Sequence, residues 1–269
     1  LTPVEGLRVG LGMLADSEPM PHHYLVCGAL PVFLAALLRA AEGKAALAPD
    51  PALTTAQDLL RMLRGRRADP AFEKGLDTYL ATVADHGFNA STFTARVVAS
   101  TRAGLISSVL AALCALKGPL HGGAPGPVLD MFDEIGTPER AGAWLDDAFA
   151  KGARLMGFGH RIYKVRDPRA DVLKNTVATL PQTAGRLAFA VEVERSAIAA
   201  LRKHKPGQRL DTNVEFYTAL LLEALEVPRS AFTALFAVGR AAGWCAHIFE
   251  QEKGGRLIRP QSNYVGPRP

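Results

Sequence analysis

Hydrophobic side chains recur at helical spacing along most of the chain. From Thr54 onward, apolar residues return every three or four positions as far as Leu63, and Thr54 with Gln57 matches a capping-box pattern. We therefore predict a short helix that begins after Thr54. It should end near Gly65, because glycine is common just past a helix end.

Similar apolar stripes, and some fully apolar stretches, follow through the rest of the sequence. Asp69 with Pro70, and Thr137 with Pro138, each combine a capping side chain with a proline suited to the first helical turn. The sequence has no alternating series of Val, Ile and Thr, the pattern typical of strands. We therefore predict an all-α fold. The predicted helical ranges are 70–85, 89–116, 138–152, 183–203, 214–226 and 229–252.

Composition limits the class of protein. The chain has 269 residues, of which 48% are hydrophobic, so it can bury the core of one large domain, with or without a smaller one. The longest apolar run, 25–38, contains Pro31 and is shorter than the roughly 20 residues that cross a bilayer, so we predict no membrane span. The sequence begins with Leu1 and shows no secretory signal pattern.

Cysteines indicate the compartment. Cys27, Cys114 and Cys245 are odd in number, far apart and surrounded by apolar residues. This pattern argues against a disulfide framework and favours reduced core thiols in a cytoplasmic protein.

The formal net charge of +5 raises the question of nucleic-acid binding. The basic residues are dispersed and no aromatic residues interleave with them, so acidic small molecules explain the charge better. One basic cluster, from Arg161 to Arg169, directly follows His160. A second, from Arg202 to Arg209, is interpreted as a solvated helix end, since cations are favourable near helix C-termini.

Two histidines stand between residues that break helices. His121 lies in Gly-Pro-Leu-His-Gly-Gly and His160 in Gly-Phe-Gly-His-Arg, and Glu215 follows as an isolated carboxylate in Asn-Val-Glu-Phe-Tyr. A histidine that transfers protons needs a fixed position and a defined tautomer, so this trio predicts an acid/base site. A surface turn remains the simpler alternative for each histidine.

Other site classes fit the sequence less well. The Gly157–His160 segment lacks the Gly-Lys-Ser/Thr ending of a phosphate loop and the third glycine of a dinucleotide fingerprint. No His-Glu-x-x-His or Cys-x-x-Cys spacing is present, so we predict neither a metal nor a bound cofactor.

Five segments, taken in order, resemble the signatures of the citrate synthase family, and the likeness extends from about Pro21 to the C-terminus. These segments are Ala84–Phe93, Gly118–Gly123, Gly157–Lys164 with Asp167-Pro168-Arg169, Asn213–Tyr217, and Arg259–Ser262.

The resemblance implies a two-domain helical homodimer that condenses an acyl-CoA with oxaloacetate in the cleft between its domains. The large domain would comprise 1–122 and 227–269, and the small domain 123–226. Acetyl-CoA or propionyl-CoA would be the acyl donor, and the product would be citrate or 2-methylcitrate.

The resemblance also implies a role for each matching residue. His121 would stabilise the enol of the thioester, His160 would bind and protonate the ketone of oxaloacetate, and Glu215 would be the base. The residues implied for oxaloacetate are His86, Arg169, Arg240 and Arg259, the last reaching the partner subunit's substrate. Those implied for CoA are Gly157, Gly159, Arg161 and Lys164.

The residues alone also allow simpler roles for three of these side chains. His86 could be favoured by a helix C-terminus, Arg240 could extend to solvent, and Arg259 could be a tail charge.

The chain departs from the family pattern in three places. Glu215 stands where the family carries aspartate, and Ala124-Pro125-Gly126 replaces the usual Ala-Asn-Glu. About a hundred residues that precede the position of Leu1 in typical members are not in the sequence. These departures keep a second hypothesis open, a non-catalytic paralogue that binds CoA or a dicarboxylate as a sensor or assembly partner.

Overall fold

In the computed structural model, the described residues are 1–267 except 120, 123–124, 160–165 and 209. Among them, twelve α-helices and two short 3₁₀ turns form the secondary structure, and the one β contact is an isolated bridge between Phe158 and Thr212. The prediction of an all-α fold is confirmed.

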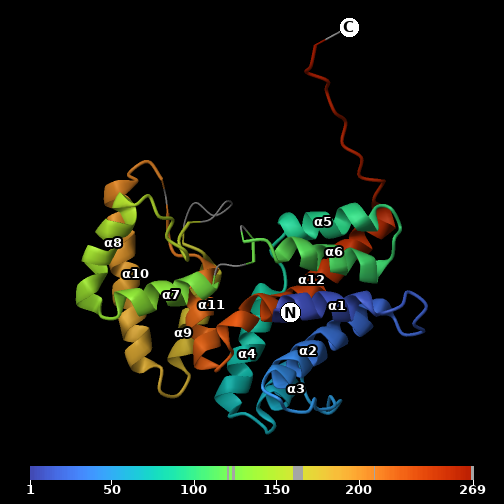
Figure 1. Cartoon of the computed structure of the whole chain (residues 1–269), viewed down its shortest axis with the longest axis horizontal. Helices are drawn as coiled ribbons and strands as arrows, with labels where there is room; N and C mark the ends of the chain where they lie inside the picture. Colours follow the sequence, from blue (N-terminus) through green and yellow to red (C-terminus); the bar gives the residue numbers. More distant parts are fainter. Residues whose placement is uncertain (120, 123–124, 160–165, 209, 268–269) are drawn as a thin grey trace.

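The helices gather in two groups (Figure 1). The first group holds α1 (Pro3–Gly12), α2 (His22–Ala41), α3 (Thr55–Arg64), α4 (Pro70–Val83), α5 (Ala90–Ala99), α6 (Leu105–Leu116) and α12 (Phe232–Gly254). The second holds α7 (Pro125–Ile135), α8 (Ala141–Ala150), α9 (Pro168–Ala178), α10 (Ala184–His204) and α11 (Val214–Ala224). The 3₁₀ turns are Pro138–Arg140 and Arg229–Ala231.

Local capping explains several helix ends. Thr54 accepts a hydrogen bond from the backbone N–H of Gln57 in a complete capping box, and Gly65 ends α3 with φ +77°. Asp69 caps α4 by accepting from the N–H of Ala71. Thr137 makes no capping bond and precedes a 3₁₀ turn, so α8 starts one turn later than predicted.

The predicted helix 89–116 is two helices. Gly104 adopts φ +91°, a conformation open mainly to glycine, and the chain turns back between α5 and α6 so that the two pack against each other. Their continuous apolar pattern conceals the break, because both helices bury a face in the same core.

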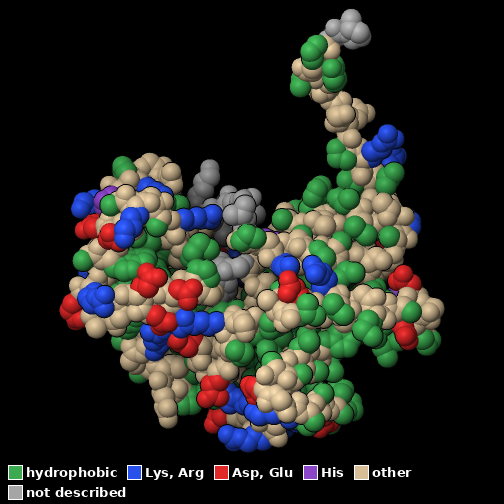
Figure 2. All heavy atoms as spheres, in the orientation of Figure 1, with side chains coloured by type: hydrophobic (Ala, Val, Ile, Leu, Met, Phe, Trp, Pro, Cys, Tyr) green, Lys and Arg blue, Asp and Glu red, His purple; other side chains and the backbone are tan. Residues whose placement is uncertain are grey.

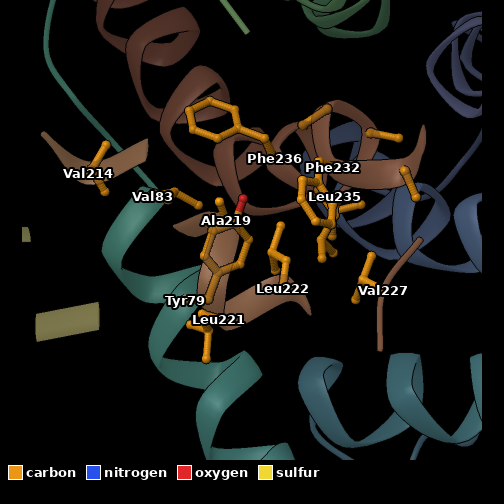
Figure 3. Close-up of a cluster of buried hydrophobic side chains, with 14 of the residues drawn as sticks. Tyr79, Val83, Val214, Ala219, Leu221, Leu222, Val227, Phe232, Leu235 and Phe236 are labelled. Atoms are coloured by element: carbon orange, nitrogen blue, oxygen red, sulfur yellow. The ribbon is translucent and has the colours of Figure 1, made fainter. Parts of the chain in front are cut away.

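The core is a continuous cluster that runs through both groups of helices. Figure 3 shows Tyr79 and Val83 of α4 against Ala219 and Leu222 of α11, with Phe236 of α12 above them. The second group of helices is therefore joined to the first through α4, which packs against α9 and lies beside α11, and through α12, which packs against α7.

Two segments are long and apolar enough to cross a membrane by length and composition. In Arg229–Gly254, 72% of the apolar stretch is buried, as expected for a core helix. In α2 the share is 33%, and Pro31 lies inside the helix. Core helices pass the same test, so the lack of a membrane span stays a prediction.

Charged side chains of both signs are mixed on the surface. Basic and acidic side chains intermix over α7–α11 on the face in view (Figure 2).

The three cysteines differ in burial. Cys245 is buried and Cys27 is half-buried, whereas Cys114 is exposed. The prediction of a core thiol is therefore wrong for Cys114, whose helix α6 turns it outward from the apolar face.

Candidate active site

A cleft of about 630 Å³ is lined by residues from both groups of helices. It brings together seven of the predicted site residues, namely His86, His121, Gly157, Gly159, Arg169, Glu215 and Arg240. His160, Arg161 and Lys164 lie outside the described residues.

His121 is held by the start of α5. Its Nε2 lies 2.9 Å from Ser91 Oγ and 3.2 Å from the backbone nitrogen of Ser91, whose N–H donates to it. Ser91 Oγ also accepts a hydrogen bond from Trp244 Nε1 at 3.1 Å, and its single proton is donated either to Asn89 Oδ1, 2.8 Å away, or to His121 Nε2. Helices α5 and α12 therefore share one polar network under the imidazole.

This network defines the tautomer of His121. A backbone N–H can only donate, so Nε2 must be the accepting nitrogen and the neutral ring carries its proton on Nδ1. The imidazole can therefore donate a hydrogen bond through Nδ1 while remaining uncharged.

Glu215 stands in the first turn of α11, whose N-terminus is tied to the loop 157–159. Asn213 Oδ1 accepts from the Glu215 N–H at 3.0 Å, and Asn213 Nδ2 donates to the Gly159 carbonyl at 2.9 Å. The Asn213 N–H donates to the Gly157 carbonyl at 2.9 Å. One asparagine thus fixes both the helix start and the cleft wall beside it.

The surroundings of Glu215 make its carboxyl a weak acid. Burial raises its pKa to about 7, and the charge of Asp167 adds to this, although the charges of Arg169 and Arg240 oppose it. Its Oε2 is buried and has no hydrogen-bond partner among the described residues. A carboxylate with a pKa near neutrality is suited to take up a proton from carbon.

Arg240 is buried in α12, so the alternative that it extends to solvent is wrong. Its Nε donates to the Val83 carbonyl at 2.6 Å, and its guanidinium carbon lies 4.7 Å from the Phe236 ring centroid. Burial and the nearby charge of Arg169 lower its pKa to about 10, so it still carries a positive charge at neutral pH.

Small residues lie near Arg240 in α12, on the side that packs against the end of α4. An added methyl group at Gly239 would meet Val83, and one at Gly243 would meet the backbone of Ala84. These glycines let the end of α4 pack directly against α12.

Arg169 is oriented by the residue two positions before it. Its Nε and Nη2 donate to the two carboxylate oxygens of Asp167 at 3.0 and 2.8 Å. Asp167 also caps α9 and accepts from the Val214 N–H at 3.2 Å. Because Asp167 connects the starts of α9 and α11, it fixes the positions of Arg169 and Glu215 relative to each other.

The buried carboxylate of Glu194 stabilises the segment that precedes Glu215. Glu194 accepts hydrogen bonds from Arg166 Nη1, Thr212 Oγ1 and the Tyr217 hydroxyl, each at 2.6 Å. Burial alone would raise the pKa of Glu194, but these partners outweigh burial and leave the pKa below its ordinary value. The segment that precedes Glu215 is thus anchored to α10.

Gly157 and Gly159 both adopt positive φ, +85° and +81°. An added Cβ at Gly157 would lie 3.0 Å from Phe216, and one at Gly159 would lie 2.8 Å from Leu210. Backbone conformation and packing against protein atoms thus require glycine at both positions. Their predicted contact with CoA stays a prediction.

Arg259 lies apart from the other predicted residues. It is exposed in the C-terminal tail, which runs away from the body of the chain (Figure 1), and it is not among the residues that line the cleft. Within one subunit it is a tail charge, and its predicted contact with a partner's substrate stays a prediction.

Sequence reasoning missed several side chains of the cleft. Arg154 and Lys205 add positive charge to its lining, although Lys205 belongs to the cluster interpreted as a solvated helix end. Ser91 was missed as the partner of His121, and only its place after Asn89 in a motif segment could have signalled it. Among the described residues, no group of three or more His, Cys, Asp or Glu side chains could hold a metal ion.

Comparisons with known proteins point to one family over most of the chain. The family described as "Citrate synthase, C-terminal domain" matches residues 1–261. A "Putative citrate synthase 2" of Mycobacterium tuberculosis is 46% identical over 201 residues, which are 75% of this chain and 53% of that protein. The "Citrate synthase" of Deinococcus radiodurans is 39% identical over 236 residues, 87% of this chain and 62% of that protein. The chain thus spans about half the length of the first of these relatives.

Solved structures share the fold. Citrate synthase from Thermotoga maritima superposes with a TM-score of 0.87 at 35% identity, covering 99% of this chain and 72% of that one. The ternary complex of carboxymethyl coenzyme A and oxaloacetate with citrate synthase from Thermoplasma acidophilum superposes with a TM-score of 0.89 at 31% identity, covering 100% of this chain and 74% of that one. The chain therefore belongs to the citrate synthase family.

Proposed function

We propose that the protein condenses an acyl-CoA with oxaloacetate and releases a tricarboxylate and CoA. The observation that carries this proposal is one cleft that holds a carboxyl group with a pKa of about 7, a neutral histidine that can donate through Nδ1, and two arginines. A base beside a hydrogen-bond donor is what enolisation of a thioester requires.

Glu215 is the base in this proposal. Its carboxylate removes a proton from the carbon next to the thioester carbonyl, while His121 Nδ1–H donates to the carbonyl oxygen that becomes the enolate. The enolate carbon then attacks the ketone of oxaloacetate. We assign protonation of that ketone oxygen to His160 by family likeness, and water then hydrolyses the thioester to release CoA.

The arginines and His86 are proposed to bind oxaloacetate. A dianion needs several cations, and Arg169, oriented by Asp167, lines the cleft together with Arg240. Arg240 is fixed at the base of the cleft by its bond to Val83. We infer that Arg259 reaches the cleft of a partner subunit, since it lies outside the cleft of its own.

The phosphates of CoA need positive charge. Arg154 and Lys205 supply it in the cleft lining, close in sequence to Leu155 and Leu201, which add apolar surface. Together with Arg161 and Lys164, and with backbone approach at Gly157 and Gly159, they form the proposed CoA site.

Three further features belong to the proposal. The protein acts as a homodimer, it works in the cytoplasm, and the two domains are 1–122 with 227–269, and 123–226. The apolar α2, with only 33% of its apolar stretch buried, is compatible with a subunit contact.

Thiol release tests the activity. The protein should release free thiol from acetyl-CoA, propionyl-CoA or a longer acyl-CoA only when oxaloacetate is present. Oxaloacetate binding by calorimetry without any thiol release would favour the non-catalytic paralogue instead.

A further inference from the structure

Two buried polar atoms near the base of the cleft lack hydrogen-bond partners among the described residues. One is the hydroxyl oxygen of Tyr79, which is fully buried in α4, and the other is Oε2 of Glu215. The first belongs to a donor and the second to an acceptor, and an unpaired buried polar group is costly. They are therefore complementary.

Tyr79 belongs to a part of α4 that passes close to α11, since an added Cβ at Gly75, one turn earlier, would lie 3.7 Å from Leu221. Ala219 lies one turn after Glu215, and residues four apart are neighbours on a helix surface. Figure 3 shows the Tyr79 ring beside Ala219, with its hydroxyl oxygen directed toward Phe236, which lines the cleft. Glu215, in the first turn of α11, lines the same cleft as Phe236, so the hydroxyl is directed toward the cleft that Glu215 lines.

Electrostatics agrees with this placement. The pKa of Tyr79 is raised by burial first and then by the negative charge of Glu215, while Arg240 opposes the rise. The phenol therefore stays protonated, and it can act only as a donor toward a carboxylate.

We propose that Tyr79 is a positioning residue for Glu215, with its hydroxyl donating to Oε2 through one bound water. This proposal rests on the proposed function, in which Glu215 is the base. The hydroxyl holds the longer glutamate side chain in place and stabilises its ionised form before it takes a proton.

Tyr79 acts among several other groups that face the same carboxyl. Arg169 from α9 and Arg240 from α12 favour the ionised form of Glu215, and Asp167 at the start of α9 opposes it. His86 and His121 line the same cleft. Of these, Tyr79 is the buried neutral donor whose hydrogen bond is still unassigned among the described residues.

The test is Tyr79→Phe, read through the pH profile of kcat/KM for thiol release. Loss of the donor should raise the pKa of Glu215, so the acidic limb should move by roughly one unit to higher pH. At a pH one unit below the parent limb, kcat/KM of the variant should be about tenfold lower than that of the parent, each taken relative to its own alkaline plateau. Tyr24→Phe removes an exposed hydroxyl from α2 and should leave the limb unchanged.

A purely structural role for Tyr79 would lower stability without moving the limb, and that result would overturn the proposal. So would a shift seen in Thr218→Val instead, because Thr218 carries another buried hydroxyl on α11 without a partner among the described residues. Glu215→Asp shortens the side chain, so Tyr79→Phe in that background should move the limb by much less than in the parent.

Failure of the proposed function would be recognised separately, because the parent would then release no thiol. The hydroxyl can still be tested by urea unfolding between pH 5 and 9. Without Tyr79 the carboxyl keeps its proton to higher pH, so the fall in stability should continue about one unit further than in the parent. Identical pH courses in the two proteins would overturn the proposal.

Discussion

His121 and Glu215 face the same cleft but are held in different ways. His121 Nε2 meets both the N–H and the Oγ of Ser91, and Trp244 and Asn89 fix that serine in turn. Glu215 Oε2 is buried without a hydrogen-bond partner among the described residues. The group that must keep one tautomer is fixed by direct protein hydrogen bonds, whereas the group that must change its charge is buried and has only the proposed donor, Tyr79, for its Oε2.

The difference has a chemical reason. A hydrogen-bond donor for an enolate works best when it needs no reorganisation during the reaction. A base works best when its pKa lies near the operating pH, and burial achieves this for Glu215 where full hydrogen bonding would keep the pKa low. His121 thus depends on rigid positioning, and Glu215 depends on desolvation, within one cleft.

Removing the carboxylate should have the largest effect. Glu215→Gln keeps the size of the side chain but cannot accept the proton, so kcat for thiol release should fall roughly a thousandfold. The measurement is initial rate at saturating acyl-CoA and oxaloacetate.

Glu18→Gln, which changes an exposed carboxyl, is the matched control and should keep the parent rate. If kcat of the Glu215→Gln protein stayed within about threefold of the parent value, another group would be the base. The contrast between His121 and Glu215 would then not describe the catalytic groups.

The raised pKa of Glu215 should also appear in stability. This pKa is about 7 in the folded protein, against an ordinary value of 4.5 for a solvated glutamate of the unfolded chain, so the folded state holds the proton more tightly. The stabilising contribution is complete below about pH 4.5, falls as pH rises, and is lost above about pH 7. Relative to Glu215→Gln, the parent should therefore lose about 3 kcal/mol at most between about pH 4.5 and 8.

Urea unfolding at several pH values measures this difference, with Glu18→Gln again as the control. A free-energy difference between parent and Glu215→Gln that stays constant with pH would show that Glu215 is well solvated in the folded protein.

Helices could be predicted where the signal is local. The capping box at Thr54 and the cap at Asp69 predicted the starts of α3 and α4, because a side chain and a backbone N–H three or two residues away decide them. The break at Gly104 was missed, since both flanking helices are apolar and only their packing reveals the turn. Helices α1, α2, α7 and α9 were absent from the predicted ranges.

The site could be predicted only as a set of residues. Short motifs indicated His121 and Glu215, and the family resemblance added Arg240. The fold brings the three to one cleft from the turn after α6, from α11 and from α12. The partners Ser91, Asp167 and Tyr79 could not be inferred, because their roles depend on contacts between helices far apart in sequence.

A third prediction concerns the wall that carries Arg240. Gly243→Ala would place a methyl group against the Ala84 carbonyl, so α4 must move away from α12 and the free energy of unfolding should fall by about 1–3 kcal/mol. Gly254→Ala has open space around it in the same helix and should be neutral or slightly stabilising. Urea unfolding of both proteins separates packing from helix propensity, and equal stabilities would contradict the close approach of the two helices.

The smallest effect tests how firmly His121 must be held. Ser91→Ala keeps the backbone N–H that donates to Nε2 but removes the hydroxyl that joins His121 to Trp244 and Asn89. The tautomer is kept while the position loosens, so kcat should fall about tenfold and the acidic limb should stay where it is. Ser108→Ala removes another buried hydroxyl, one that donates to the Gly104 carbonyl, and should leave kcat unchanged. If Ser91→Ala kept the parent kcat, the amide alone would hold the imidazole, and the hydroxyl network would serve packing between α5 and α12 rather than the enolate.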